Sequence, residues 1–166
     1  MPERPEPQSE PRWLNASEQS AWRSFIDGVR SLTDVLDRQL QADSNLPHSY
    51  FEILIPLSEV PGRQMRMSEL AESTRSSRSR LSHAIARLEE RGWVERLDCP
   101  TDKRGQLARL TDVGFRVVEE AAPGHVEAVR TYLIDLLSPD QLEALGQIGR
   151  TMLKATADTD LPPRRT

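Results

Sequence analysis

The segment from Ser68 to Leu110 constrains the fold more than any other part of the chain, because helix and strand signals follow one another closely there. Ser68 is a suitable N-cap for a short helix, and Ser76 or Ser77 can begin a second helix that ends at Gly92. An alternating segment at 93–97 predicts a strand, a polar turn follows at 99–105, and a second strand is expected at 106–110. Helix, helix, strand, turn, strand is the order of a winged helix-turn-helix. The expected fold is mainly α with a small two-stranded β wing.

Long amphipathic helices are expected on both sides of this lobe. Asn15 and Glu18 have the spacing of a capping box, and apolar residues then recur every three or four positions over about 15–42. After Thr111 a further helix is expected, which Pro123-Gly124 should kink or interrupt, and Ser138-Pro139 begins the last one. The predicted organisation is a disordered N-terminal arm (1–12), a dimerisation helix (13–45), a winged helix-turn-helix lobe (46–111), C-terminal dimerisation helices (112–157) and a disordered tail (158–166).

The apolar stripes of the flanking helices, at 15–42 and 125–155, are wider than a small winged lobe can cover. A second copy of the chain would cover them, and a homodimer would place two equivalent helices about one DNA turn, ~34 Å, apart. The alternative is that these helices pack only on their own lobe. We therefore expect a homodimer.

The charge distribution favours nucleic acid as a partner although the whole chain carries a net charge of −4. Between Arg63 and Arg109 there are eleven basic and seven acidic residues, a net +4, which leaves −8 for the rest of the chain. A basic middle between acidic flanks is typical of a DNA-binding module, whereas a merely solvated surface would mix the two signs throughout.

The second helix of the lobe has an outer face suited to the major groove of DNA. If Leu81, Ala84, Ile85 and Leu88 face the core, the opposite face is small and polar, and arginines flank it. From Thr74 to Leu88 there are four arginines and no carboxylate. Arginine can donate two hydrogen bonds to guanine, and serine and histidine can contact bases or phosphates. The candidate DNA-binding residues of this helix are Ser77, Arg78, Ser79, Arg80, Ser82, His83 and Arg87. The alternative interpretation is a solvated helix face.

The polar turn between the two strands adds a second candidate contact. Lys103 and Arg104 lie at its tip, where they could enter a minor groove, and Asp102 is expected to accept a hydrogen bond from a nearby arginine and hold the shape of the turn. We therefore include Asp102, Lys103 and Arg104 in the candidate DNA-binding surface.

Other classes of function have little support in the sequence. His48, His83 and His125 lack metal-ligand spacing, and we find no Gly-x-Ser-x-Gly and no phosphate-binding glycine loop, so no catalytic residue, cofactor or metal is predicted. There is no apolar run of about 20 residues and no secretory signal, and Cys99 is the single cysteine. These features predict a cytoplasmic protein that does not act at a membrane and is not an enzyme.

Several motifs in this order resemble the MarR family of winged helix-turn-helix transcriptional regulators. They are Met67–Glu72, Ser79–His83, Arg87–Gly92, Asp102–Gly105 and Leu110–Gly114. The resemblance implies a homodimer with interleaved terminal helices that binds a pseudo-palindromic inverted repeat in double-stranded DNA. It matches Ser77, Arg78, Arg80, Ser82 and His83 to recognition-helix positions, and Asp102 and Arg104 to the Asp-x-Arg of the wing. The segment 73–80 is richer in serine and arginine than in many members, so the operator sequence cannot be inferred from relatives.

The resemblance also implies a mode of regulation: repression by promoter occlusion, relieved by a small phenolic or lipophilic effector in the crevice between dimer helices and lobe. The ligand-binding residues stay unknown. Two alternatives remain at this point, a winged-helix module that binds another protein, and a redox-sensing regulator. In the second, Asp98 would disfavour the Cys99 thiolate and Lys103 and Arg104 would favour it.

Overall fold

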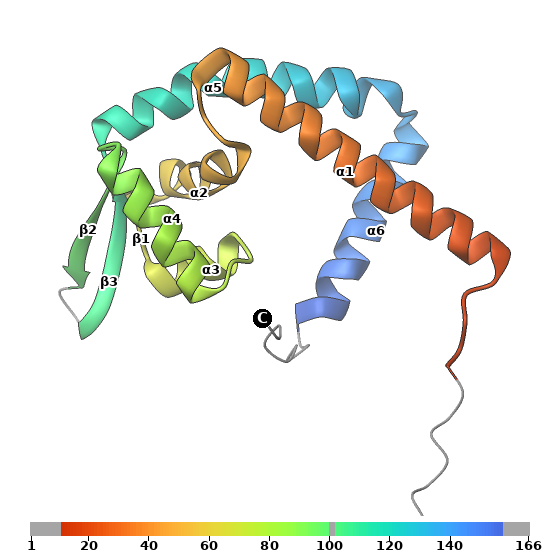
Figure 1. Ribbon diagram of the computed structural model, residues 1–166, viewed down its shortest axis with the longest axis horizontal. Helices are drawn as coiled ribbons and strands as arrows, with labels where there is room; N and C mark the ends of the chain where they lie inside the picture. The colour runs from red at the N-terminus through yellow and green to blue at the C-terminus, as the bar shows by residue number, and fades with distance from the viewer. Residues whose placement is uncertain (1–10, 100–101, 158–166) are drawn as a thin grey trace, which may run out of the picture. The chain divides into compact units, whose positions relative to one another are not determined.

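The computed structural model describes residues 11–99 and 102–157 of the chain. In chain order, the elements are α1 (Ala16–Ser44), α2 (His48–Glu59), a 3₁₀ turn at Pro61–Arg63, β1 (Gln64–Arg66), α3 (Met67–Ser73), α4 (Arg78–Glu90), β2 (Val94–Cys99), β3 (Asp102–Leu110), α5 (Asp112–Tyr132), a 3₁₀ turn at Ile134–Leu136, and α6 (Pro139–Ala157) (Figure 1). The prediction of a mainly α fold with a small β wing is confirmed. None of the helices in the described ranges is long and apolar enough to cross a membrane.

The sheet has three antiparallel strands in the order β1-β3-β2: β2 and β3 form the predicted two-stranded wing, and the short β1 is a third strand that the sequence did not predict. The short segment β1 pairs with β3, with Met65 opposite Ala108, because the inner half of β3 would otherwise have an unpaired edge. The second strand also begins at Asp102 instead of Gln106, since the β2–β3 ladder continues to the pair Cys99–Asp102. The predicted polar turn at 99–105 is therefore too long. Residues 100 and 101 lie outside the described residues.

Helix ends follow the capping signals in most places. Asn15 and Glu18 bond reciprocally at the start of α1, at 2.8 and 2.9 Å, and Ser138 and Gln141 do so at the start of α6. The predicted cap at Ser68 is wrong by two positions, because α3 begins at Met67 and the Glu69 carboxylate accepts from the backbone N–H of Arg66.

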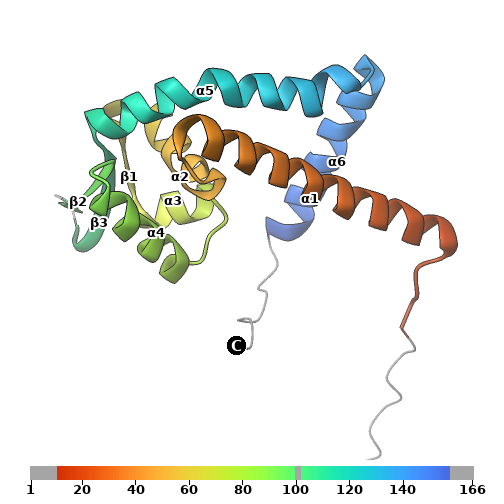
Figure 2. The same ribbon diagram turned by 45° about the horizontal axis from the view of Figure 1, so that its top comes forward.

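The predicted interruption at Pro123-Gly124 is wrong, because α5 continues through both residues to Tyr132. Packing against α2 stabilises this helix and offsets the hydrogen bond that a proline cannot donate (Figure 2). Gly124 leaves room for α1, since a Cβ there would lie 2.9 Å from Gln39 Nε2. The break between the C-terminal helices lies instead at 133–138, between α5 and α6.

One apolar core holds α2, α3, α4 and the sheet together. Leu81, Ile85 and Leu88 of α4 are buried, as the sequence predicts, and Ala84 is partly buried. They pack in one cluster with buried side chains of α2, α3 and β3, among them Leu54, Leu57, Leu70, Ala108 and Leu110. The chain divides into two compact units, 1–34 and 35–166, and this core lies wholly in the second.

Candidate nucleic-acid interface

The start of α4 is fixed by the turn that joins it to α3. Arg75 in that turn has a left-handed backbone, with φ of 50°, and the backbone N–H of Ser76 donates to the Ala71 carbonyl at 2.9 Å. The Ser77 hydroxyl then accepts from the backbone N–H of Arg80 at 3.3 Å and caps α4. The cap is one of the two that the sequence allowed, and it orients the first turn of α4.

The outer face of α4 has the exposure expected of a surface that meets a partner. All seven candidate residues of this helix and its cap are exposed: Ser77, Arg78, Ser79, Arg80, Ser82, His83 and Arg87. Within the described part of the chain, Arg78 and Arg80 form no ion pair, whereas Arg87 contacts Glu90 at 2.9 Å. A hydrogen bond to Glu90 and its negative charge raise the pKa of the Arg87 guanidinium. Two unpaired arginines therefore stand at the N-terminal end of the helix, and the paired one stands toward its C-terminal end.

The wing residues Asp102, Lys103 and Arg104 form the first part of β3. Figures 1 and 2 show that this end of the β2–β3 hairpin is opposite to the end at which β3 leads into α5. The structure thus places the backbone of these residues at the outer end of the hairpin, and the helix of the other candidates lies in the same unit.

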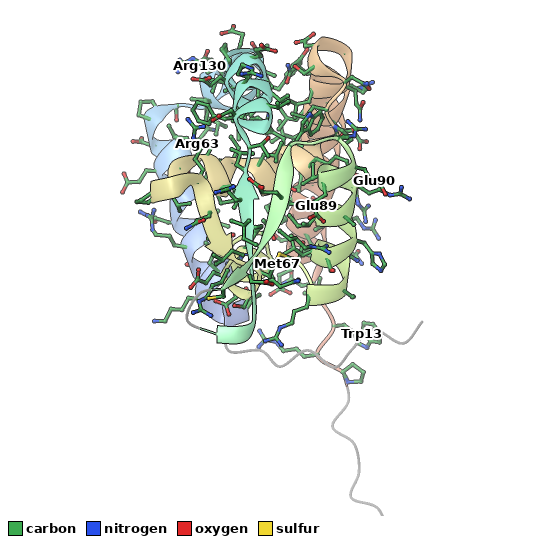
Figure 3. The ribbon with its side chains drawn as sticks, turned by 90° about the vertical axis from the view of Figure 1, so that its left-hand side faces the viewer. Trp13, Arg63, Met67, Glu89, Glu90 and Arg130 are labelled. Carbon is green, nitrogen blue, oxygen red and sulfur yellow. The ribbon has the colours of Figure 1, made fainter. Side chains whose placement is uncertain are left out.

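The sequence did not predict a link between α4 and the sheet. Arg96 of β2 lies against α4, where its Nη2 donates to the Ser82 carbonyl at 2.7 Å. Its backbone N–H donates to Glu89 Oε1 at 3.0 Å, and its Nε lies 3.4 Å from Glu89 Oε2. Figure 3 shows Glu89 on the side of α4 toward the strands and Glu90 on the outer side. No sequence signal separates this arginine from the other arginines of the segment, because the contact depends on the packing of α4 on the hairpin.

The junction between the wing and α5 is also built from polar contacts. The Thr111 hydroxyl donates to the Gly92 carbonyl at 2.7 Å and accepts from the N–H of Gly114 at 3.0 Å. Arg63 lies 3.4 Å from the centroid of the Phe115 ring and 3.1 Å from Asp112 Oδ1. These contacts fix the direction in which α5 leaves the lobe.

A cavity of about 420 Å³ lies where α2, the α3–α4 turn and α5 meet. The ring of His125 packs 4.7 Å from Phe51 and 5.7 Å from His48, measured between centroids. Its Nδ1 is buried and has no hydrogen-bond partner within the described part of the chain. Burial, with a smaller contribution from His48, lowers the pKa of His125. The remaining lining residues are Glu52, Ile55, Ser73, Thr74 and Arg75.

The other chemical candidates do not come together as sites. Cys99 ends β2, and its side chain is buried. Among residues 11–99 and 102–157, no three histidine, cysteine or acidic side chains form a group that could hold a metal ion.

Comparisons with known proteins agree with this geometry. A model described as the MarR family matches residues 44–105, from the end of α1 into the wing. The transcriptional regulator HosA of Escherichia coli O111:H- is 30% identical over 112 residues, which cover 67% of this chain and 80% of HosA. The chain belongs to the MarR family. The transcriptional repressor MprA of Escherichia coli K12 is 31% identical over 103 residues, 62% of this chain, and the match spans only 58% of MprA.

Solved structures extend the similarity to nearly the whole chain. Sco3205, a MarR family transcriptional regulator from Streptomyces coelicolor crystallised in complex with DNA, is 52% identical, with a TM-score of 0.88, and the match covers 93% of this chain and 98% of Sco3205. AbsC, a MarR family regulator from the same organism, is 41% identical with a TM-score of 0.86, over 90% of this chain and 100% of AbsC.

Proposed function

We propose that this MarR family chain is a sequence-specific DNA-binding transcriptional regulator, a repressor that binds an inverted-repeat operator as a homodimer. The observation that carries the proposal is the outer face of α4, which is exposed, free of carboxylate between Thr74 and Leu88, and led by two arginines without an ion pair in the described residues. The 52% identical regulator crystallised with DNA supports the same function.

The physical basis is the match between α4 and a major groove. The small residues Ser79 and Ser82 leave the outer face of α4 narrow enough to enter the groove. Arg78 and Arg80 can donate hydrogen bonds to guanine edges or phosphates. The positive end of the α4 dipole adds to this attraction. The wing residues Asp102, Lys103 and Arg104 are proposed to lie at a neighbouring minor groove, with Arg104 as the main contact and Asp102 holding the turn.

Exposed apolar side chains on the terminal helices support the proposed homodimer. In the first unit, Trp13, Trp22 and Val29 are exposed. In the second unit the exposed apolar side chains of α5, α6 and the turn between them include Val126, Tyr132, Leu136, Ile148, Met152 and Leu153. A monomer would leave these surfaces in water, whereas a second copy would bury them. We therefore assign 13–45 and 112–157 to dimerisation and 46–111 to DNA binding, in a protein that acts in the cytoplasm.

The cavity beside His48 and His125 supports regulation by a small phenolic or lipophilic effector. An apolar wall, Phe51 and Ile55, faces a few polar groups, which is the usual make-up of a small-molecule site. An effector that favours a different spacing of the two lobes would release the operator and relieve repression.

The alternative functions receive less support. A face that binds another protein would favour exposed aromatic and leucine side chains, and α4 has serines and arginines there. A redox sensor needs an accessible thiolate, and Cys99 has only 7% of its surface exposed.

Selection of bound duplexes from random-sequence DNA, followed by titration across salt, tests the proposal. Enrichment of an inverted repeat with half-sites about one helical turn apart, and affinity that falls with salt, is the expected result. Arg78→Ala and Arg80→Ala should each weaken specific binding by about 1–3 kcal/mol. Arg104→Ala should instead weaken binding to every duplex and lower the slope of affinity against salt concentration. Arg116→Ala on α5 removes an equal charge and is the control. The assignment of α4 as the helix that recognises DNA would be contradicted if no duplex is enriched. It would also be contradicted if Arg80→Ala still distinguishes the enriched duplex from other duplexes.

A further inference from the structure

We propose that Arg96 is a positioning residue for DNA recognition: it holds α4 at one rotation and one depth against the wing, and it orients the Ser82 hydroxyl. The inference rests on the proposed function and deepens it. Arg96 lies on β2, outside the exposed face of α4, and its side chain is only 26% exposed.

The contacts of Arg96 extend along two turns of α4. Its Nη2 bonds the Ser82 carbonyl at 2.7 Å, and its backbone N–H and Nε contact the two oxygens of Glu89 at 3.0 and 3.4 Å. Residues seven apart lie on the same side of a helix, so Arg96 ties two points of one face. Its guanidinium bonds Ser82, its backbone N–H bonds Glu89, and Nε adds an ion pair with Glu89 that is not a hydrogen bond in the described residues. Two separated and directional contacts resist both rotation of α4 about its axis and sliding along it.

The N-terminal half of α4 needs such a restraint. Leu81 is the one fully buried side chain in the first turn and a half, and Arg78, Ser79, Arg80, Ser82 and His83 are all exposed. Apolar packing is non-directional, so a contact through Leu81 alone tolerates small rotations. Groups that contact bases need to be held within about 0.5 Å and 10–20° of their working geometry.

Arg96 also determines what Ser82 can offer to DNA. The Nη2 atom lies 3.4 Å from Ser82 Oγ, and because a guanidinium has only donors, the hydroxyl oxygen is the acceptor in this contact. The hydroxyl hydrogen is then left to point away from Arg96. Ser82 is thereby presented as a donor, suited to guanine N7 or O6, thymine O4 or a phosphate oxygen.

The test compares affinities for the duplex enriched by the wild-type protein and for a scrambled duplex of equal length. We expect Arg96→Gln to weaken binding of the enriched duplex about tenfold, with scrambled-duplex affinity and salt slope nearly unchanged. Arg96→Lys keeps the charge but cannot span Ser82 and Glu89, so it should lose most of the same affinity. Arg109→Gln is the matched control, because Arg109 pairs with Glu95 within the same sheet, at 2.6 Å, and that pair does not involve α4.

The direction in which Glu89→Ala changes DNA affinity distinguishes a positioning role from simple electrostatics. If only electrostatics matters, removal of a negative charge near DNA should strengthen binding of every duplex. If Arg96 positions α4, loss of its contact with Glu89 should weaken binding of the enriched duplex and reduce the ratio of enriched-duplex affinity to scrambled-duplex affinity. A lower salt slope in Arg96→Gln would mean that Arg96 contacts phosphate directly, and unchanged discrimination would mean that it positions nothing. Either result overturns the inference.

Hydrogen exchange of the DNA-free protein provides a second measurement. In Arg96→Gln and Arg96→Lys, amides of 82–90 should exchange several-fold faster, while amides of α2 keep wild-type rates. Unchanged exchange in 82–90 overturns the inference even if no duplex is enriched. Failure of the wild-type protein to bind any duplex would instead contradict the proposed function, so the two failures are distinguishable.

Discussion

Gly114→Ala should be among the most destabilising single-methyl additions in this chain. Gly114 lies in the first turn of α5, where it packs against the backbone that follows α4. A Cβ at this position would lie 2.1 Å from the Trp93 carbonyl oxygen and 2.8 Å from Leu110 Cδ1. Ordinary contacts of a Cβ lie at 3.4–4 Å, so the carbonyl contact is more than 1 Å too short. The nearest atom is backbone and cannot rotate away.

The magnitude follows from what must move. If α5 shifts away from Trp93, the backbone bond from Thr111 to the Trp93 carbonyl, at 3.0 Å, and the Thr111 bond to Gly92, at 2.7 Å, lengthen together. Overpacking costs about 1–3 kcal/mol, and loss of an N-cap costs about 1 kcal/mol. We expect a loss of about 3 kcal/mol in the free energy of unfolding. For a chain of this size that corresponds to a fall in Tm of about 6–12 °C.

The free energy of unfolding can be measured by urea unfolding followed by circular dichroism. All variants are compared at one protein concentration, because any association makes the apparent stability depend on concentration. Val113→Ala is the control, because Val113 is the preceding residue of the same turn and is 46% exposed. It should change stability by about 0.5 kcal/mol or less. A Gly114→Ala protein within 0.5 kcal/mol of wild type would refute the close packing of α5 on the Trp93 carbonyl.

Three further predictions concern a histidine, the cysteine and the state of association. Burial lowers the pKa of His125 in the folded chain, so its contribution to stability is complete above the ordinary value of 6.5 and is lost as the pH falls below that value. In urea titrations, the free energy of unfolding should therefore fall less between pH 7.5 and 5.5 for His125→Phe than for the wild-type protein. Equal falls would contradict the lowered pKa of His125. Because Cys99 is buried, peroxide should leave DNA affinity unchanged in wild type and Cys99→Ser alike, and a change confined to wild type would revive redox sensing. Light scattering at micromolar concentration should give twice the chain mass of 18.8 kDa, and a monomer mass would remove the homodimer.

Local signals in the sequence were sufficient to predict most helices of this fold. The capping residues Asn15, Ser77, Thr111 and Ser138 each act within three or four positions, so a linear pattern contains the whole interaction. Sheet pairing depends instead on residues far apart in the chain. The partners of Gln64–Arg66 lie more than 40 positions away, at Leu107–Arg109, and three residues offer too little alternation to predict a strand.

The candidate DNA-binding face was predictable for a related reason. The helical period separates Leu81, Ile85 and Leu88 from the polar residues on the other side, and the structure reproduces that separation. The period does not show which charged groups neutralise one another. Glu89 and Glu90 are adjacent in sequence, yet one contacts Arg96 of the sheet and the other contacts Arg87 of the same helix.

The positions of Glu89 and Glu90 explain how one helix can both pack on the sheet and keep unpaired arginines on its outer face. Both acids of α4 lie in its C-terminal end, where they form ion pairs with Arg87 and Arg96. The N-terminal end keeps Arg78 and Arg80 without an ion pair in the described residues, at the positive pole of the helix dipole. A glutamate at position 78–83 would compete with phosphate for these arginines, and the same glutamate at 89 serves as an anchor. The position of the acids along α4, rather than the net charge of −4, is therefore what makes this helix compatible with the proposed DNA-binding surface.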